Sequence, residues 1–417
     1  MKVLVIGSGL IGITTAYFLA QYGHEVSVID RASGPGQETS FANGALLTPS
    51  MAEPWNSPGV WRALLASLGR SDAPVQLCLR VLPQLTTWGV RFLSNSRRGA
   101  FERNALHNLR LSLYSLEAMR LLREDTYIEY DRTAQGSLRV FRDRASLDLA
   151  LRAAQRTESA GLRFRGLSPA EIVDLEPTLE PICRELVGGI HYETDEVGDA
   201  YRFCLALEDC ARREGVKFYY GQEVSTLEIC SGAIGAVICG RERREADRYI
   251  VAAGSYSPAL LRGCGVHLPV QPVKGYSLSF QRDEGLPPLR VPVVDDRLHA
   301  VAVPLGSTIR VAGTAEFAGY DLRPNPERIK NLASLLRAIF PRAEFASSHA
   351  RPWCGLRSVS ADGVPIIGPT KVPNLLINTG HGHLGWTMAV GSAVMLAALI
   401  SGRPPSLDPG PYLLDRF

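Results

Sequence analysis

The sequence has few features that would mark a disulfide-rich, metal-binding, nucleic-acid-binding or membrane-spanning protein. Its eight cysteines are scattered and none forms a C-x-x-C pair, which is typical of a reduced protein without a disulfide framework or zinc site. The net charge of +3 is small for 417 residues and no basic run resembles a nucleic-acid patch, so we expect no nucleic acid partner. The longest apolar stretch, Trp386 to Ile400, is shorter than the roughly 20 residues of a bilayer span and indicates a buried core helix.

The composition is otherwise that of an ordinary globular protein, with 46% hydrophobic and 21% charged residues. A chain of 417 residues is longer than one hydrophobic core usually supports, so we expect two domains. The first and last parts of the chain have α/β patterns, whereas the middle, from about residue 265 to 355, has the alternating apolar residues of antiparallel strands. We therefore predict an α/β fold with a second, antiparallel domain.

The first thirty residues carry the pattern of a dinucleotide-binding unit. An apolar strand over 2–6 is followed by a G-x-G-x-x-G turn, a helix and a second strand that ends at Asp30; the turn is Gly7-Ser8-Gly9-Leu10-Ile11-Gly12. In such a unit the first glycine permits the tight turn, the second lets a pyrophosphate approach the helix N-terminus, and the third lets helix and strand pack closely. Asp30 can accept hydrogen bonds from both ribose hydroxyls and would repel a 2′-phosphate. The unit alone predicts a dinucleotide without a 2′-phosphate, and leaves NAD and FAD open.

A second glycine-rich segment, 378–386, leads into the apolar stretch near the C-terminus. A helix N-terminus suits a group that becomes negative during a reaction, as a reduced flavin does at its N1–C2=O edge. His381 and His383 lie close together here, but no third metal ligand is nearby, so we expect no metal and interpret both as loop contacts.

Arg357 stands in a segment, 353–368, that is nearly free of other charges. A guanidinium in such a segment needs an anionic partner, and its planar fork suits a carboxylate. The segment alone is equally compatible with a substrate carboxylate and with a structural ion pair.

Residues 50–100 interleave Trp, Leu and Arg with almost no acidic residues. Apolar residues at helical spacing predict two helices, which would cover an active site. The same composition fits a basic, apolar surface that docks on an anionic membrane. Both interpretations are compatible with the sequence.

Several motifs taken together resemble the FAD-dependent D-amino-acid dehydrogenase family, within the larger D-amino-acid oxidase and glycine oxidase fold group. They are Gly7–Gly12 with Asp30-Arg31, Glu38–Gly44, Val273-Lys274-Gly275-Tyr276-Ser277, Gly355-Leu356-Arg357 and Thr379–Thr387. The resemblance covers nearly the whole chain. It implies a Rossmann-like FAD-binding domain and a discontinuous α+β substrate domain built on an antiparallel sheet. We place the first at 1–50, 161–265 and 350–417, and the second at 51–160 and 266–349, with a helical insertion near 50–100.

The resemblance further implies non-covalent FAD and a set of residues that contact it. These would be Gly7, Gly9, Leu10, Ile11, Gly12, Asp30 and Arg31 at the pyrophosphate and ribose, Ser40, Ala42, Asn43, Gly44 and Leu47 along the flavin and ribityl chain, Val224 and Gly254 beside the nucleotide, and Gly380, Gly382, His383, Leu384 and Gly385 at the flavin edge.

For the substrate, the resemblance assigns Arg357 to a carboxylate and has Tyr276 face the amino acid, with Lys274 and His381 as further catalytic candidates. The implied reaction is oxidative deamination of D-amino acids to 2-oxo acids and ammonia, with hydride transfer from Cα to FAD N5. Electrons would pass to a quinone or another respiratory-chain acceptor. We expect a cytoplasmic enzyme that the insertion could dock on the inner face of the cytoplasmic membrane.

Three alternatives stay open. The substrate could be a cyclic imino acid such as D-proline or D-hydroxyproline. The enzyme could be an oxidase that makes peroxide. The chain could also be a non-catalytic flavin- or nucleotide-binding module, although Arg357 and the glycine segment 378–386 argue against it.

Overall fold

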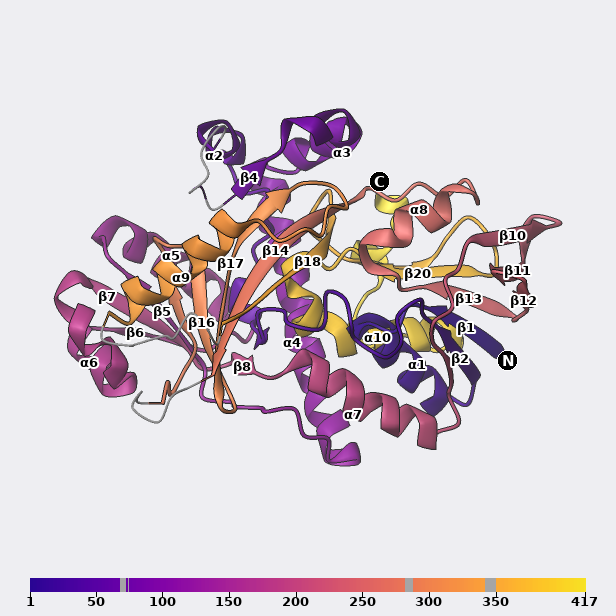
Figure 1. The fold of residues 1–417 in the computed structure, drawn as a ribbon, viewed down its shortest axis with the longest axis horizontal. Coiled ribbons are helices and arrows are strands. Elements are labelled where there is room, and N and C mark those ends of the chain that lie inside the picture. The colour runs from indigo at the N-terminus through magenta and orange to yellow at the C-terminus, as the bar shows by residue number, and fades with distance from the viewer. Residues whose placement is uncertain (68–72, 74, 282–287, 342–349) are drawn as a thin grey trace.

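The structure is a computed structural model that describes residues 1–67, 73, 75–281, 288–341 and 350–417. Two large sheets lie toward opposite ends of its longest axis (Figure 1). Of the predicted insertion, residues 68–72 and 74 lie outside the described part of the chain.

The smaller of these sheets is mostly parallel. Its strands, in spatial order, are β19 (Ile366–Pro369), β20 (Leu375–Thr379), β13 (Arg248–Val251), β1 (Lys2–Ile6), β2 (Glu25–Ile29) and β9 (Lys217–Tyr219). Only the β19–β20 pair is antiparallel. The apolar run of β1 is buried on both faces: Val3 and Val5 pack with helices, whereas Leu4 and Ile6 pack toward the opposite layer. This is the environment that a near-continuous hydrophobic strand requires.

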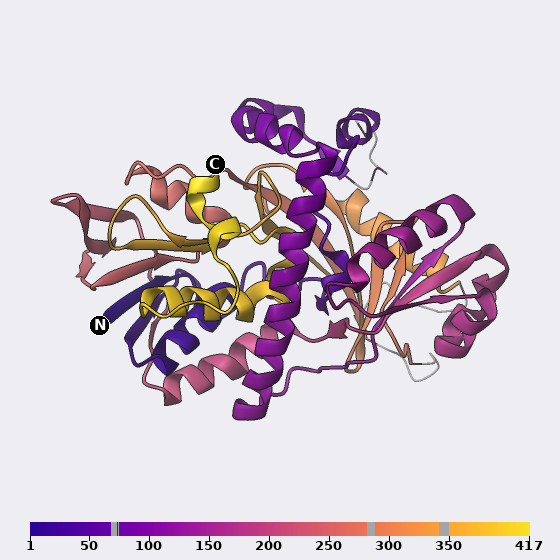
Figure 2. The same ribbon diagram turned by 180° about the vertical axis from the view of Figure 1, so that it is seen from behind.

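Three helices cover one face of this sheet: α1 (Leu10–Gln21), α7 (Ala200–Arg213) and α10 (Gly385–Ile400). The apolar segment Gly382–Ile400 is long enough by length and composition to cross a membrane, yet 72% of it is buried inside the structure. It contacts α1 and α4 (Arg98–Thr126), as a core helix does. Figure 2 shows α4 running across the molecule between its two ends.

The larger sheet is mostly antiparallel. Its strands, in spatial order, are β18 (Arg351–Ser360), β14 (Val270–Gln281), β17 (Thr308–Phe317), β16 (Ala300–Leu305), β15 (Val293–Asp295), β5 (Ser137–Phe141), β7 (Gly188–Tyr192) and β6 (Phe164–Leu167). A further strand, β4 (Val75–Leu77), pairs with β17.

The remaining elements are short sheets and helices around these two. The strands are β10 (Thr226–Cys230), β11 (Ala233–Cys239) and β12 (Glu242–Arg244) in one small sheet, and β3 (Leu46–Leu47) with β8 (Glu196–Val197) in another. The helices are α2 (Val60–Ala66), α3 (Leu82–Ser94), α5 (Arg144–Glu158), α6 (Pro169–Leu175), α8 (Ser257–Arg262) and α9 (Pro326–Ile339).

The predicted fold class, a Rossmann-like half with a second half built on an antiparallel sheet, is confirmed. Sheet membership differs from the predicted division at three strands. Strands β6 and β7 fall within 161–265 and β18 within 350–417, yet all three belong to the larger sheet. The reason is long-range pairing: all of β7 pairs with β5 and all of β18 pairs with β14, and the sequence does not reveal pairs between such distant segments. The domain boundaries as a whole stay a prediction.

Candidate active site

A cavity of about 1840 Å³ is lined by residues from both halves of the molecule. One end lies at the β1–α1 turn, and its walls include residues of β14, β17 and β18 from the larger sheet. Pockets for small ligands usually measure roughly 300 to 1,000 Å³, so this cavity has room for a dinucleotide and a further ligand.

The β1–α1 turn forms the phosphate end of the cavity. Gly7 has a φ of +109°, and a Cβ there would lie 2.6 Å from the Ala252 carbonyl oxygen. A Cβ on Gly12 would lie 1.8 Å from the Gly7 carbonyl oxygen. Gly12 therefore supports the close packing of helix on strand, as predicted, and does not itself border the cavity. The N-terminus of α1 opens toward the cavity, where its N–H groups and dipole favour an anion.

Ser40 and Asp30 lie beside this helix N-terminus. The Leu10 N–H donates to Ser40 Oγ at 3.1 Å. Asp30 accepts hydrogen bonds from the Ser8 and Ala32 N–H groups at 2.6 and 2.7 Å. These contacts fix the Asp30 carboxylate at the cavity wall, in the place predicted for a ribose contact.

Arg31 lines the same part of the cavity but is already engaged within the protein. Its guanidinium forms an ion pair with Glu38 and lies 3.9 Å from the centre of the Tyr256 ring. Tyr256 packs in turn on Tyr320, with ring centres 5.3 Å apart. Arg31 therefore links the loop after β2 to the segment after β13 and helps to wall the nucleotide end.

A second helix N-terminus, that of α10, begins at Gly385 on the cavity wall. His381 Nε2 lies 2.9 Å from Ser392 Oγ, and His383 Nε2 lies 2.9 Å from the Met51 carbonyl oxygen. Burial lowers the pKa of His381 to about 3 and that of His383 to about 4. Both imidazoles are therefore neutral near pH 7, and each makes a contact within the protein; the catalytic role of His381 and the cofactor contact of His383 stay predictions.

Arg357 lines the cavity as a cation without a carboxylate partner among the described residues. Its Nη1 donates to the Thr314 carbonyl oxygen at 3.3 Å, and its Cζ lies 5.6 Å from the centre of the Trp55 ring. Burial lowers its pKa to about 10, which leaves it charged near neutral pH. A structural ion pair, one of the two interpretations of its sequence, is not what these contacts show. The guanidinium is thus placed to bind an anionic ligand.

Gly275 makes room for this guanidinium. A Cβ at Gly275 would lie 2.1 Å from Arg357 Nη1. Gly275 and Arg357 come from neighbouring strands, β14 and β18, which pair in antiparallel register. Any side chain at the glycine of the Lys274-Gly275-Tyr276 motif would therefore clash with the guanidinium in its observed position.

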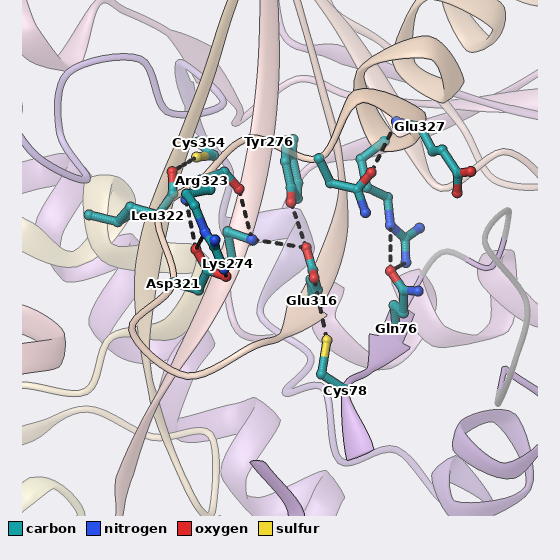
Figure 3. A network of polar contacts seen from close by, with 12 residues as sticks. Gln76, Cys78, Lys274, Tyr276, Glu316, Asp321, Leu322, Arg323, Glu327 and Cys354 are labelled. Atoms are coloured by element: carbon teal, nitrogen blue, oxygen red, sulfur yellow. Dashed lines mark hydrogen bonds and ion pairs between the residues drawn. The ribbon is translucent and has the colours of Figure 1, made fainter. Parts of the chain in front are cut away.

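Lys274 and Tyr276 differ from their predicted roles. Lys274 does not border the cavity; its Nζ lies 3.2 Å from Glu316 Oε2. Tyr276 borders the cavity, but its hydroxyl donates its hydrogen bond to Glu316, as Figure 3 shows. It is therefore not directed at a ligand in the cavity. Burial, and after it Glu316, raises the pKa of the Tyr276 phenol. Because successive side chains of a strand point to opposite faces, these two flank Gly275 on the far side of β14.

Two predicted cofactor contacts, Leu47 and Leu384, lie in the hydrophobic core around α1 and α10 and do not border the cavity. In the two-residue strand β3, alternation turns Leu46 to the cavity and Leu47 to the core. The other predicted residues that border the cavity are Gly9, Leu10, Ile11, Ala42, Asn43, Gly44, Val224, Gly254, Gly380 and Gly382.

Trp55 and Thr314 are wall residues that the sequence did not single out. Trp55 stacks on His383 with ring centres 5.5 Å apart. The dipeptide Pro54-Trp55 was a visible signal within the insertion, but nothing local links it to Arg357. Thr314 carries no sequence signal, because its place depends on how three strands pair.

The donor set of this cavity fits a flavin dinucleotide. A glycine turn and one helix N-terminus form its phosphate end, and a second glycine segment and helix N-terminus lie on its wall. The sequence matches the model of the FAD dependent oxidoreductase family over residues 2–399. The chain belongs to this family. FAD is therefore the cofactor of the enzyme.

Relatives agree with this assignment, and a solved structure shares the fold. The enzyme is 42% identical over 419 residues to a D-amino acid dehydrogenase of Paramagnetospirillum magneticum, covering 100% of this chain and 99% of the relative. It is 43% identical over 410 residues to a D-amino acid dehydrogenase of Dechloromonas aromatica, covering 97% and 98%. Its fold is similar to glycine oxidase from Geobacillus kaustophilus, with a TM-score of 0.77 and 20% identity over 100% and 99% of the two chains.

Proposed function

We propose that the enzyme oxidises D-amino acids to 2-oxo acids and ammonia. The observation that carries the proposal is Arg357, a cation on the wall of the flavin cavity that has no carboxylate partner among the described residues. Arg357 is half-buried, and a partly desolvated charge without a partner is costly unless a ligand supplies one; an amino acid brings a carboxylate. The relatives named D-amino acid dehydrogenase, at about 40% identity over the whole chain, support the same substrate class.

The chemistry divides between cofactor and protein. FAD, when bound, would supply the two-electron acceptor: the neutral amine of the substrate would lose its Cα hydrogen as hydride to the flavin and one nitrogen proton to water, and so become an imine. Water then hydrolyses the imine to the 2-oxo acid and ammonia. Arg357 holds the carboxylate and so fixes the orientation of Cα, which supplies much of the rate enhancement. The N-terminus of α10 favours negative charge at the cavity wall, and neutral His381 and His383 add no charge of their own.

Arg357→Ala tests the proposal, with Arg144→Ala as a control in which an exposed arginine of α5 is lost. The reduction of the flavin by a panel of D-amino and imino acids is followed without oxygen. We expect a fall in kcat/KM on the order of 10²- to 10³-fold for Arg357→Ala, with raised KM, and no change for the control. Wild-type-like kinetics in Arg357→Ala contradict the carboxylate assignment. Failure of every compound to bleach the wild-type flavin contradicts the reaction and favours a non-catalytic flavin module.

We propose that the flavin is held without a covalent bond. Cys354, the cysteine nearest Arg357 in sequence, directs its Sγ to the Leu322 carbonyl oxygen at 3.0 Å and does not border the cavity. Acid precipitation should therefore leave a colourless pellet and a yellow supernatant. A yellow pellet contradicts this proposal.

We propose a quinone or another respiratory-chain component as the electron acceptor, reached at the inner face of the cytoplasmic membrane. Exposed apolar side chains gather on the insertion: Trp61 and Leu65 on α2, Leu79 beside β4 and Val90 on α3, the last two being 68% and 67% exposed. Arg62 lies among them on α2. Apolar residues interleaved with arginine are typical of a surface that binds anionic lipid.

Vesicle flotation tests this surface. We expect the protein to float with vesicles that contain phosphatidylglycerol, and the double variant Trp61→Ser with Leu65→Ser to stay in solution. Leu121→Ser on α4 is the matched control, because Leu121 and Trp61 are both 48% exposed. Equal flotation of all three proteins contradicts the assignment of the surface. Oxygen uptake with and without added quinone then separates a dehydrogenase from an oxidase.

A further inference from the structure

Strand β17 contains a bulge at Thr314, beside the cavity. Opposite it on β14, Gly275 pairs with Ala315 and the next residue, Tyr276, pairs with Gly313. Thr314 is therefore left without a partner in this ladder. Its φ of +56° lies in the left-handed region, which a β-branched residue rarely adopts. Bulges and strained backbone of this kind gather next to active sites, where they re-aim backbone or side chains.

The other edge of β17 changes partner at the same residue. Strand β16 pairs with β17 as far as Gly313, and β4 pairs with it from Ala315 onward. Thr314 thus lies outside the ladders on both edges. Its carbonyl oxygen accepts instead from Arg357 Nη1 at 3.3 Å. This is the hydrogen bond that holds the guanidinium on its Nη1 side.

The backbone on the C-terminal side of the bulge is anchored by Glu316, whose contacts Figure 3 shows. Glu316 is 6% exposed. It pairs directly across the ladder with Lys274, accepts from the Tyr276 hydroxyl, and lies 3.4 Å from Cys78 Sγ, at the end of β4. One side chain therefore ties β14, β17 and the β4 segment together within two residues of Thr314.

We propose that Thr314 is a positioning residue for substrate binding: the bulge aims its carbonyl oxygen at Arg357 and holds the guanidinium in the orientation that accepts a carboxylate, while the Glu316 network keeps the bulge in place. With one Nη1 hydrogen committed to Thr314, the remaining donors of Arg357 are left for the ligand. Lys274 and Tyr276 act through Glu316 and not on the substrate. This inference rests on the proposed carboxylate role of Arg357 but not on the identity of the substrate.

Deletion of Thr314 tests the proposal, because it removes the residue without a ladder partner and lets β17 pair regularly. Thr308→Val is the matched control: it replaces a threonine of the same strand at a position that does not border the cavity. Binding of benzoate, which carries a carboxylate and no amine, is measured on the FAD-loaded proteins by the change in flavin absorbance. Benzamide, its neutral analogue, makes no demand on the Arg357 charge.

We expect the deletion to raise the Kd of benzoate by about 10- to 100-fold, the range for loss of a hydrogen bond to a charged group. Benzamide binding and FAD content should stay at wild-type levels, and Thr308→Val should resemble the wild type throughout. In turnover the deletion should raise KM much more than it lowers kcat.

Wild-type affinity of the deletion variant for benzoate overturns the proposal, and so does an equal loss of benzoate and benzamide binding. If the deletion variant does not fold, Glu316→Gln takes its place, with a rise in benzoate Kd expected and an unchanged Kd overturning the proposal. If the wild-type enzyme binds no simple carboxylate, the proposed role of Arg357 is contradicted, and the positioning role of Thr314 that rests on it is overturned as well. Normal benzoate binding without reaction of any amino acid instead overturns only the proposed substrate.

Discussion

Trp55 stacks on His383 with ring planes 12° apart and ring centres 5.5 Å apart. The same indole lies 5.6 Å from the Arg357 guanidinium, so one side chain of the insertion joins the glycine segment before α10 to the anion site. Since a cation is attracted to the face of an aromatic ring, Trp55 stabilises the charged guanidinium inside the cavity.

Loss of this ring should weaken carboxylate binding. A cation–π contact is worth roughly 0.5 to 2 kcal/mol, so we expect Trp55→Ala to raise the Kd of benzoate by about 3- to 30-fold. Trp55→Phe keeps an aromatic face and should recover much of the affinity. Flavin absorbance titration measures both, with Trp61→Ala as the control, because Trp61 is an exposed tryptophan of the same insertion. Equal affinities of the Ala and Phe variants would show that the ring face does not contribute.

A methyl group at Gly275 should displace Arg357 and leave the fold intact. The atom that the new Cβ would meet, at 2.1 Å, is the end of a flexible side chain, so the guanidinium can move aside at little cost in stability. We expect Gly275→Ala to retain FAD and its melting temperature within a few degrees while losing benzoate binding by at least about tenfold.

Gly99→Ala is the control for this change. Gly99 lies in the first turn of α4, and a Cβ there has nothing within 4 Å. Its affinity for benzoate should be that of the wild type. A Gly275→Ala protein that binds benzoate normally would mean that Arg357 does not need its observed position.

The sequence predicted the β1–α1–β2 unit well because each of its signals is local. The glycine turn, the apolar strand and Asp30 act within thirty residues, and the structure places Gly7, Gly9 and Asp30 at the cavity. Local signals also explain the capping box at the start of α6, which Ser168 and Glu171 form within four residues. Arg357 was also recognisable, since an isolated charge in an apolar segment requires a partner wherever the segment lies.

What the sequence could not show depends on pairing between distant strands. Alternation in β14 separates Gly275 from Lys274 and Tyr276, but only the pairing with β18 and β17 decides which face meets the cavity. The bulge at Thr314 exists because the β14–β17 ladder shifts register at the residue where the other edge of β17 changes partner from β16 to β4. For the same reason β4 was not predicted within the insertion: its partner, β17, is more than two hundred residues away.

Replacing one member of the Lys274–Glu316 pair should lower the free energy of unfolding more than replacing both members. Burial would raise the pKa of the Glu316 carboxyl, but the Tyr276 hydroxyl and the Lys274 ammonium outweigh this effect and hold that pKa below its usual value. The Lys274 and Glu316 side chains are 3% and 8% exposed, so either charge alone would be stranded in the interior. We expect Glu316→Leu and Lys274→Met each to lower the free energy of unfolding by about 3 to 5 kcal/mol.

The double variant should be less destabilised than the sum of the two single variants, because it leaves no unpaired charge. Urea denaturation followed by tryptophan fluorescence measures the coupling. Strictly additive losses would mean that the two side chains do not depend on each other. Benzoate binding of the folded double variant then reports whether apolar packing alone can hold the Thr314 bulge.

Asp195 should make the stability of the protein depend on pH in a direction opposite to that of most carboxylates. It is 1% exposed and accepts hydrogen bonds from Ser50 Oγ and Ser137 Oγ, both at 2.6 Å. Burial raises its pKa from 3.8 to about 6. The folded state therefore binds this proton more tightly than the unfolded state does. The resulting stabilisation is fully present below pH 3.8 and is lost as the pH rises to about 6.

Asp195→Asn removes this titration and keeps the shape of the side chain. The difference in unfolding free energy between variant and wild type should shift in favour of the variant by about 2 kcal/mol between pH 4 and 7, and level off above that range. Urea midpoints at half-unit steps of pH measure this shift, and groups that titrate in both proteins cancel in the difference.

Asp143→Asn, at the exposed N-cap of α5, is the control with the opposite sign: hydrogen bonds from Ser146 lower the pKa of that carboxyl. A flat difference for Asp195→Asn would mean that this carboxyl is ionised in the folded protein throughout the range.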